Sequence, residues 1–253
     1  MALKPVIEEA KEKFRAIIAN HRLGNETAQI TIGALSAEQA IGGSPSRQDF
    51  ALLEGKEVMI EAQFKGSFGQ AFTDQPRKFI GSLKDVLSLS LNTNNDRAIF
   101  VATLNAVTAH LGIITGVRHC HDEEPEKCGT EIAQYILREF GRIKVGIVGY
   151  QPAILENMVS SFGAHNVQCS DLNPKNIASH KFGVEIRDGR SENTKLIKWC
   201  DLLLGTSTAI VNNTFDDIRE VAISQGKQLI MFGVTGAGVS VLLGLARLCF
   251  LAH

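Results

Sequence analysis

A regular alternation of short apolar strands and helices after about residue 142 most constrains the fold of this chain. Lys144 to Gly149 reads as a short buried strand, and Pro152 stands at the favoured first position of the following helix. Further strands are expected at Asn166 to Cys169, Asp201 to Gly205 and Gln228 to Gly233. Strands that alternate with helices predict a parallel sheet with helices on both faces, which is a doubly wound α/β unit.

The first half of the chain has a different pattern. Pro5 to Asn20 carries an apolar stripe at helical spacing, and Ala28 to Leu35 and Val58 to Phe64 read as strands. Glycines directly after the second strand predict a hairpin or bulge, residues 42–46 predict a loop, and two helices are expected between residues 83 and 111. We therefore predict a smaller α+β domain over residues 1–112 and the α/β domain over residues 113–253.

Composition and charge narrow the class of protein. The chain has 253 residues with 26 basic and 27 acidic side chains, so its net charge of -1 gives no field that would attract nucleic acid or anionic lipid. Five cysteines without a scaffold-like spacing predict reduced thiols, and the apolar runs are too short for a membrane span. With no signal peptide recognised at the start, we expect a cytoplasmic protein with neither a nucleic-acid nor a membrane partner.

The run from Arg118 to Cys128 concentrates potential metal ligands. Its candidates for a transition metal ion are His119, Cys120, His121 and Glu124, because sulfur and nitrogen donors suit zinc, copper, nickel or iron. In the alternative interpretation the run is a solvated acidic loop, whose carboxylates favour the positive end of a helix starting near Pro125. The spacing matches no established ligand motif, so both interpretations stay open.

Polar residues gather where the predicted parallel strands end. In an open α/β sheet, ligands bind at the carboxyl ends of the strands. Small residues, hydroxyls and amides dominate these positions, and Asp171 supplies a carboxylate. Such a surface suits hydrogen bonding to a polar ligand, although Thr208 and Asn212 are equally interpreted as helix caps, and Asp171 as part of an Asx turn. The first turn, Gly149 to Pro152, lacks the glycine-rich fingerprint of a dinucleotide site.

Several motifs together resemble a known family. The motifs are LNAV at 104–107, HC at 119–120 with EPE at 124–126, GYQPA at 149–153, DLNP at 171–174, GTST at 205–208 with Asn212 and Thr214, and GVT at 233–235. In this order, over about residues 80–253, the chain resembles the heavy-metal chelation domain family, long catalogued as of unknown function. The resemblance implies an enolase N-terminal-like domain joined to a Rossmann-like domain, with a shared cleft that binds a metal or a metal complex. It also implies that the cleft is lined by Asn105, Gln151, Asp171, Asn173, Thr206, Ser207, Thr208, Asn212 and Thr235.

The leading functional hypothesis is therefore a protein that binds a small polar, metal-containing or metal-chelating ligand in an interdomain cleft. The alternative is an enzyme that acts on a nucleotide-like or phosphorylated metabolite in the same cleft, with Cys120 as nucleophile and a neighbouring histidine as base. Adjacent residues of an extended segment point to opposite faces, which counts against that pair. A third hypothesis is that the protein is a purely structural subunit. The sequence is also compatible with a homodimer.

Overall fold

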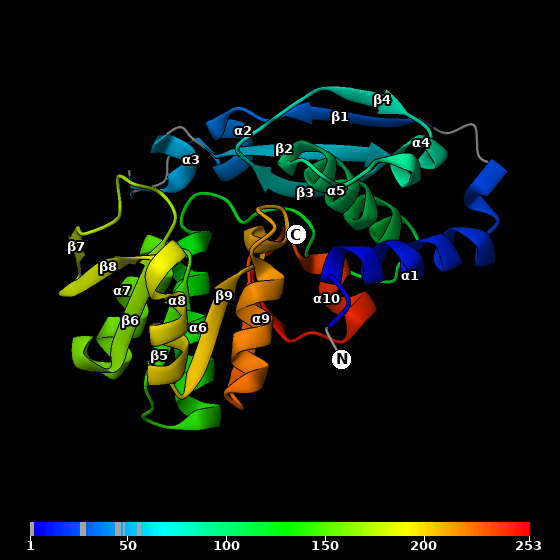
Figure 1. Ribbon diagram of the computed structural model, residues 1–253. Coiled ribbons are helices and arrows are strands. Elements are labelled where there is room, and N and C mark those ends of the chain that lie inside the picture. Colours follow the sequence, from blue (N-terminus) through cyan, green and yellow to red (C-terminus); the bar gives the residue numbers. More distant parts are fainter. Residues whose placement is uncertain (1–2, 26–28, 44–46, 48, 55–56) are drawn as a thin grey trace.

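The computed structural model describes residues 3–25, 29–43, 47, 49–54 and 57–253. The chain forms a mixed α/β fold with two sheets, of which one is antiparallel and the other largely parallel (Figure 1). This confirms the predicted fold class at that level, whereas the enolase-like and Rossmann-like assignments stay predictions. Part of the loop expected at 42–46 lies outside the described residues.

The antiparallel sheet occupies the first third of the chain. Its strands are β1 (Ile30–Ala34), β2 (Val58–Phe64), β3 (Ser67–Thr73) and β4 (Phe79–Gly81), in the order β3-β2-β1-β4. The predicted hairpin joins β2 and β3 through Lys65 and Gly66, both of which have positive φ. The short helices α2 (Ala37–Ile41) and α3 (Ala51–Glu54) lie in the connection between β1 and β2.

Three longer helices accompany this sheet, and their ends are explained by local sequence. Helix α1 (Val6–Asn20) and helix α4 (Leu83–Ser88) match the predicted segments, and Ser82 begins α4 with a capping box. Helix α5 (Asn94–His110) begins where Thr93 accepts a hydrogen bond from the Asp96 amide, and it is buried along most of its length. It packs directly on β3, because Gly69 has no side chain at the point of closest approach.

The second sheet has seven strands in the order β11-β10-β9-β5-β6-β8-β7. Four of them are the predicted strands: β5 (Val145–Val148), β6 (Val167–Asp171), β9 (Leu202–Thr206) and β10 (Gln228–Phe232). All pair in parallel, as predicted. The strands that we did not predict are at the edges, where β7 (His180–Lys181) and β8 (Val184–Asp188) form a hairpin and β11 (Arg247–Leu248) pairs with β10.

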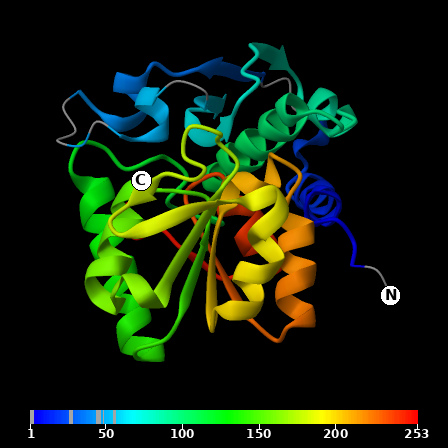
Figure 2. The same cartoon turned by 60° about the vertical axis from the view of Figure 1, so that its left-hand side comes forward.

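Helices cover both faces of this sheet (Figure 2). Helices α6 (Glu124–Phe140) and α7 (Pro152–Phe162) pack against each other on one face, and α8 (Gly189–Trp199) and α9 (Phe215–Ser224) on the other. Pro152 starts α7 as predicted. Helix α8 is longer than the expected segment from Lys195 to Cys200, because Asp188 caps a polar first turn that carries no apolar periodicity.

The two halves of the chain share packing. Helix α1 lies against α10 (Ala237–Leu243), the Val6 amide donates to Asp216 Oδ1 at 2.9 Å, and Lys13 Nζ donates to the Leu242 carbonyl at 2.8 Å. One continuous apolar core contains residues of β1, β2 and α5 together with residues of α8 and α9. The division at residues 112 and 113 separates the two sheets, and as a domain boundary it stays a prediction.

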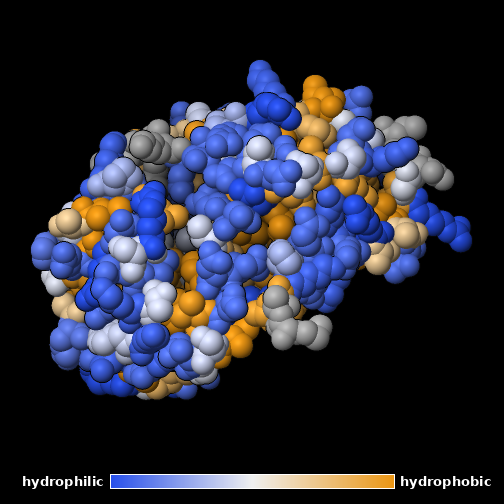
Figure 3. All heavy atoms as spheres, viewed as in Figure 1, coloured by the Kyte–Doolittle hydropathy of each residue, from blue (hydrophilic) through white to orange (hydrophobic). Residues whose placement is uncertain are grey.

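The surface is mostly hydrophilic, with some apolar residues visible where the upper and lower parts of the molecule meet (Figure 3). Within the described residues, no helix has the length and apolar character needed to cross a bilayer.

Candidate functional site

The predicted polar residues follow the carboxyl ends of the central parallel strands, which face the antiparallel sheet. Gln151 follows β5, Asp171 ends β6, Thr206 ends β9, and Thr235 follows β10. The Phe72 amide in β3 donates to Thr235 Oγ1 at 3.1 Å, so the antiparallel sheet contacts the loop that follows β10. The topology thus brings together residues that are far apart in the sequence, as expected for an open α/β sheet.

Asp171 is held by a set of hydrogen bonds at the end of β6. Its Oδ2 accepts from the Tyr150 amide at 2.7 Å, and its Oδ1 accepts from the Asn173 amide at 2.6 Å and from Asn176 Nδ2 at 3.4 Å. Desolvation by burial outweighs these bonds and raises the pKa of Asp171. The Asx turn considered from the sequence is therefore present, and Asp171 also ties β6 to the first turn after β5.

We expect Asp171→Asn to lower the free energy of unfolding by about 1–3 kcal/mol, measured by urea denaturation at neutral pH. Both carboxylate oxygens accept from N–H groups, whereas an asparagine side chain offers only one oxygen and turns an NH₂ group toward a donor. Asp188→Asn is the matched control, because the Asp188 Oδ1 alone caps α8, and it should cost less. Equal losses would contradict the two-oxygen role.

Glu57 completes an acidic site from the opposite sheet. It lies directly before β2, is half-buried, and has a pKa raised to about 7 by desolvation, with further contributions from the charges of Asp171 and Asp74. Asp74 follows β3. The charges of carboxylates from both halves of the chain thus act on Glu57. The sequence gives no local signal for this arrangement, since Glu57 and Asp74 adjoin strands with no recognisable motif.

Other predicted residues have mainly structural contacts. Asn105 is fully buried, its Nδ2 lies 3.0–3.3 Å from three backbone carbonyl oxygens, and its Oδ1 accepts from the Gly238 amide. Gln151 Oε1 accepts from the Ile154 amide at 2.6 Å and caps α7. Thr206 Oγ1 accepts from the Thr208 amide at 3.4 Å. These contacts fix the loops of the site, and binding by these residues stays a prediction.

Ser207 differs from its neighbours. It is 1% exposed, and its Oγ has no hydrogen-bond partner among the described residues. A buried hydroxyl without a partner is costly, so it is a group that a ligand or a water molecule can satisfy. Asn212 and Asn173 are half-buried, and Asn173 Oδ1 accepts from the Lys175 amide at 3.1 Å.

The predicted metal ligands lie in the segment before α6 and at its start. His119 Nδ1 is 2.6 Å from the Cys120 carbonyl oxygen, and burial lowers the pKa of this imidazole to about 4. Glu124 Oε2 accepts from the His121 amide at 2.7 Å and lies 2.9 Å from His253 Nε2, while His121 Nε2 is buried without a described partner. Within the described part of the chain, no three His, Cys, Asp or Glu side chains are grouped so that they could hold a metal ion.

The thiols of this region have different environments. Burial raises the pKa of Cys120 to about 12, so it is protonated at neutral pH and a poor nucleophile. A hydrogen bond with Cys249 lowers the pKa of Cys128 to about 6, whereas the same contact raises that of Cys249. The sequence did not suggest that Cys249 would lie beside this run.

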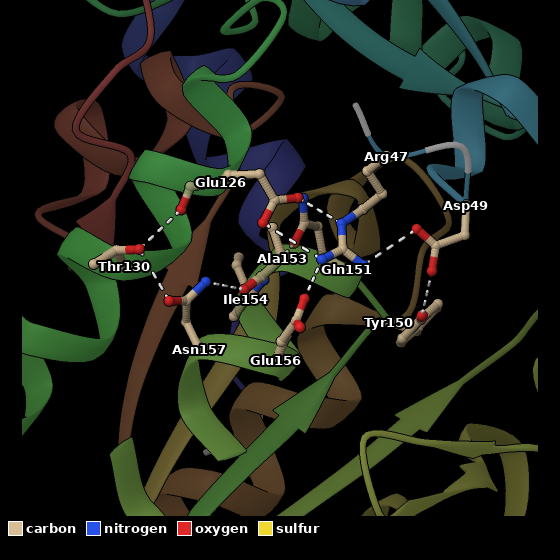
Figure 4. A network of polar contacts seen from close by, with 10 residues as sticks. All are labelled: Arg47, Asp49, Glu126, Thr130, Tyr150, Gln151, Ala153, Ile154, Glu156 and Asn157. Carbon is tan, nitrogen blue, oxygen red and sulfur yellow. Dashed lines mark hydrogen bonds and ion pairs between the residues drawn. The ribbon is translucent and has the colours of Figure 1, made fainter. Parts of the chain in front are cut away.

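A charged network that we did not predict surrounds Arg47 (Figure 4). Its guanidinium pairs with Glu126 of α6, Glu156 of α7 and Asp49, and Asp49 accepts from the Tyr150 hydroxyl at 3.3 Å. An open cavity of about 570 Å³ adjoins this network and is lined by polar residues. The network connects Arg47 and Asp49 to the loop that carries Tyr150, whose amide donates to Asp171 Oδ2.

Comparisons with known proteins agree with the resemblance. Residues 132–244 match the model of a family, DUF364, described as "Putative heavy-metal chelation". The match covers 113 of the 253 residues. The recognition made from the sequence is thus confirmed over this stretch, which contains the polar ends of β5, β6, β9 and β10.

Two solved DUF364 structures are similar to the chain. A Pyrococcus horikoshii protein of unknown function is 14% identical, with a TM-score of 0.53, and the match covers 91% of this chain and 80% of that one. A Desulfitobacterium hafniense DCB-2 protein of unknown function is also 14% identical, with a TM-score of 0.49 and coverages of 74% and 72%. The first likeness supports the fold alone, over most of the chain. No curated protein matches the chain.

Proposed function

We propose that this protein binds a small polar, metal-containing or metal-chelating ligand in a cleft between its two sheets. The proposal rests on Glu57 and Asp171, two carboxylates that adjoin strands of opposite sheets: desolvation raises the pKa of both, and the charge of Asp171 adds to the shift of Glu57. Burying like charges together is unfavourable unless a proton or a cation compensates them. A cationic or metal-bearing ligand would provide that compensation.

The available donors favour a metal complex over a bare ion. Carboxylate oxygens are suitable ligands for metal ions, but the described residues offer no group of three His, Cys, Asp or Glu side chains placed to hold one. A chelating molecule brings its own donors, so that the protein need supply only charge and hydrogen bonds. The hydroxyls and amides at the strand ends, with the unpartnered Ser207 Oγ, fit that role. The family description supports metal chelation in the same general sense.

A second candidate is general acid–base catalysis on the same ligand. The observation that favours it is the pKa of about 7 for Glu57, because a group that titrates near neutral pH exchanges protons efficiently. The protonated Cys120 thiol makes the nucleophilic alternative less favourable. In both functions Glu57 and Asp171 face the ligand.

The test is metal analysis of protein purified without chelators, followed by a thermal-shift screen of metal ions and metal chelates. A ligand at 100 times its dissociation constant should raise stability by about 2.7 kcal/mol. We expect Glu57→Gln and Asp171→Asn to remove most of that shift, and Glu131→Gln, on the exposed surface of α6, to leave it unchanged. Equal shifts in all three variants would refute the acidic site. If binding is lost in His119→Ala and Cys120→Ala but not in the acidic variants, the ligand binds instead at the run of residues 118–128.

A further inference from the structure

The C-terminal segment lies along one face of α6. Glu124 contacts His253 at 2.9 Å, Cys128 contacts Cys249, and the rings of Tyr135 and Phe250 are 6.0 Å apart. The three α6 residues share a face because their spacings of four and seven approximate whole helical turns. This segment is also fixed through its backbone, and Figure 2 shows the C-terminus near the start of α6.

Two thiols meet within this contact. Cys128 is 7% exposed, Cys249 is half-buried, and a side-chain hydrogen bond joins them. Both are free cysteines, so the two sulfur atoms are available as donors. Cys120 lies near enough to interact electrostatically with both.

A positive charge accompanies the pair. The Arg247 guanidinium interacts with both thiols through its charge. It is held in place by hydrogen bonds to the Gly233 carbonyl at 3.2 Å and the Gly116 carbonyl at 3.4 Å. Two thiolates with one monovalent cation carry a net charge of −1, which this guanidinium would offset.

The geometry points to Cys128 and Cys249 as a two-thiolate binding site for a soft monovalent metal ion of the Cu(I) type. Soft sulfur ligands select Cu(I) over hard ions, and the ligands must be deprotonated. On binding, each sulfur forms a bond to the ion and the thiol protons pass to solvent, with no change of oxidation state. Two-coordinate binding needs no third protein ligand, in agreement with the lack of a described group of three donors.

This site is separate from the acidic cleft and uses different residues from the predicted set of His119, Cys120, His121 and Glu124. Cys128 belongs to α6 and Cys249 to the segment after β11, whereas Glu57 and Asp171 adjoin β2 and β6. Its ligand class is also different, since carboxylates prefer harder ions. The inference therefore does not depend on the proposed function.

The experiment is an anaerobic titration of the reduced full-length chain with Cu(I), in competition with a chromophoric Cu(I) chelator. We expect one high-affinity ion per chain, and at least about a 100-fold weaker affinity in Cys128→Ser and in Cys249→Ser. Cys200→Ala is the control, because that thiol is buried between α8 and β5, and its affinity should be unchanged. Glu57→Gln should also bind Cu(I) normally.

Alkylation of the unsubstituted protein gives a second readout that does not depend on the folding of a variant. Bound Cu(I) should protect Cys128 and Cys249 from alkylation, as read by peptide mass spectrometry, at one equivalent of metal. Absence of protection at both positions, or Cu(I) affinity retained in both serine variants, would overturn the site. If Glu57→Gln no longer binds the cleft ligand but still binds Cu(I), the two sites are independent of each other.

Discussion

Replacing Asn105 with alanine should lower the free energy of unfolding by about 3–5 kcal/mol, since each buried polar group left unpaired costs about 1–3 kcal/mol. The Asn105 side chain receives a hydrogen bond from the Gly238 amide at 2.8 Å and donates toward the carbonyls of Gln70, Val234 and Thr235. It thereby joins α5 to β3 and to the loop before α10. Its amide has two hydrogens, so two of these carbonyls can be well satisfied at once.

The measurement is equilibrium urea unfolding at neutral pH. Asn95→Ala is the matched control, since Asn95 is a buried asparagine on the same helix whose Oδ1 accepts no hydrogen bond from the described residues. It should cost at least about 2 kcal/mol less. Asn105→Asp should be as damaging as alanine, because a carboxylate would face several carbonyl oxygens. A loss within about 1 kcal/mol for Asn105→Ala would show that water replaces the side chain.

The four central parallel strands could be predicted from the sequence because each of them depends on local patterns. The apolar runs of β5, β6, β9 and β10, the proline that starts α7 and the spacing of turns all act within a few residues. The hairpin β7–β8 and the edge strand β11 were missed, because each has only a few residues and no apolar run long enough to identify it. Helix α8 was predicted too short, since its polar start depends on a cap by Asp188.

Residues of the candidate site could be predicted only where the topology of the sheet is enough to place them at its edge. Asp171 was found from the rule that strands of a parallel sheet end at one edge, which requires no knowledge of packing. Glu57, Arg47 and Cys249 were not found, because each approaches its partners from a distant part of the chain. Pairing of that kind is determined by how α1, α5 and the C-terminal segment pack, and a single sequence carries no local signal for it.

Glu57→Gln should raise the stability of the protein above pH 7 by on the order of 3 kcal/mol. The pKa of Glu57 is raised from 4.5 to about 7 in the folded chain, so folding favours its protonated form. The stability that this carboxyl contributes is fully present below pH 4.5. It is lost as the pH rises toward 7, because the unfolded chain releases the proton first. Glutamine resembles the protonated acid and escapes this loss.

The measurement is urea unfolding of both proteins between pH 4 and pH 8. The free energies of unfolding of the two proteins should be nearly equal at pH 4 and diverge as the pH rises. The control variant Glu131→Gln should show the same pH dependence as the unsubstituted chain. The free energy of unfolding of Glu57→Gln should still fall somewhat as the pH rises, since desolvation also raises the pKa of Asp171. A variant that is less stable than the parent at pH 8 would show that the Glu57 carboxylate is stabilised in the folded chain.

Addition of a ligand to these samples links stability to function. A metal complex that binds between Glu57 and Asp171 would stabilise the ionised carboxylates, so its effect on the parent should grow as the pH rises from 5 to 8. The same ligand should have little effect on Glu57→Gln, which lacks the ionised carboxylate that the ligand would stabilise. If Glu57→Gln is more stable than the parent but binds the ligand less well, then Glu57 lowers the stability of the folded chain for the sake of ligand binding. Equal ligand stabilisation of both proteins at pH 8 would instead exclude Glu57 from the binding site.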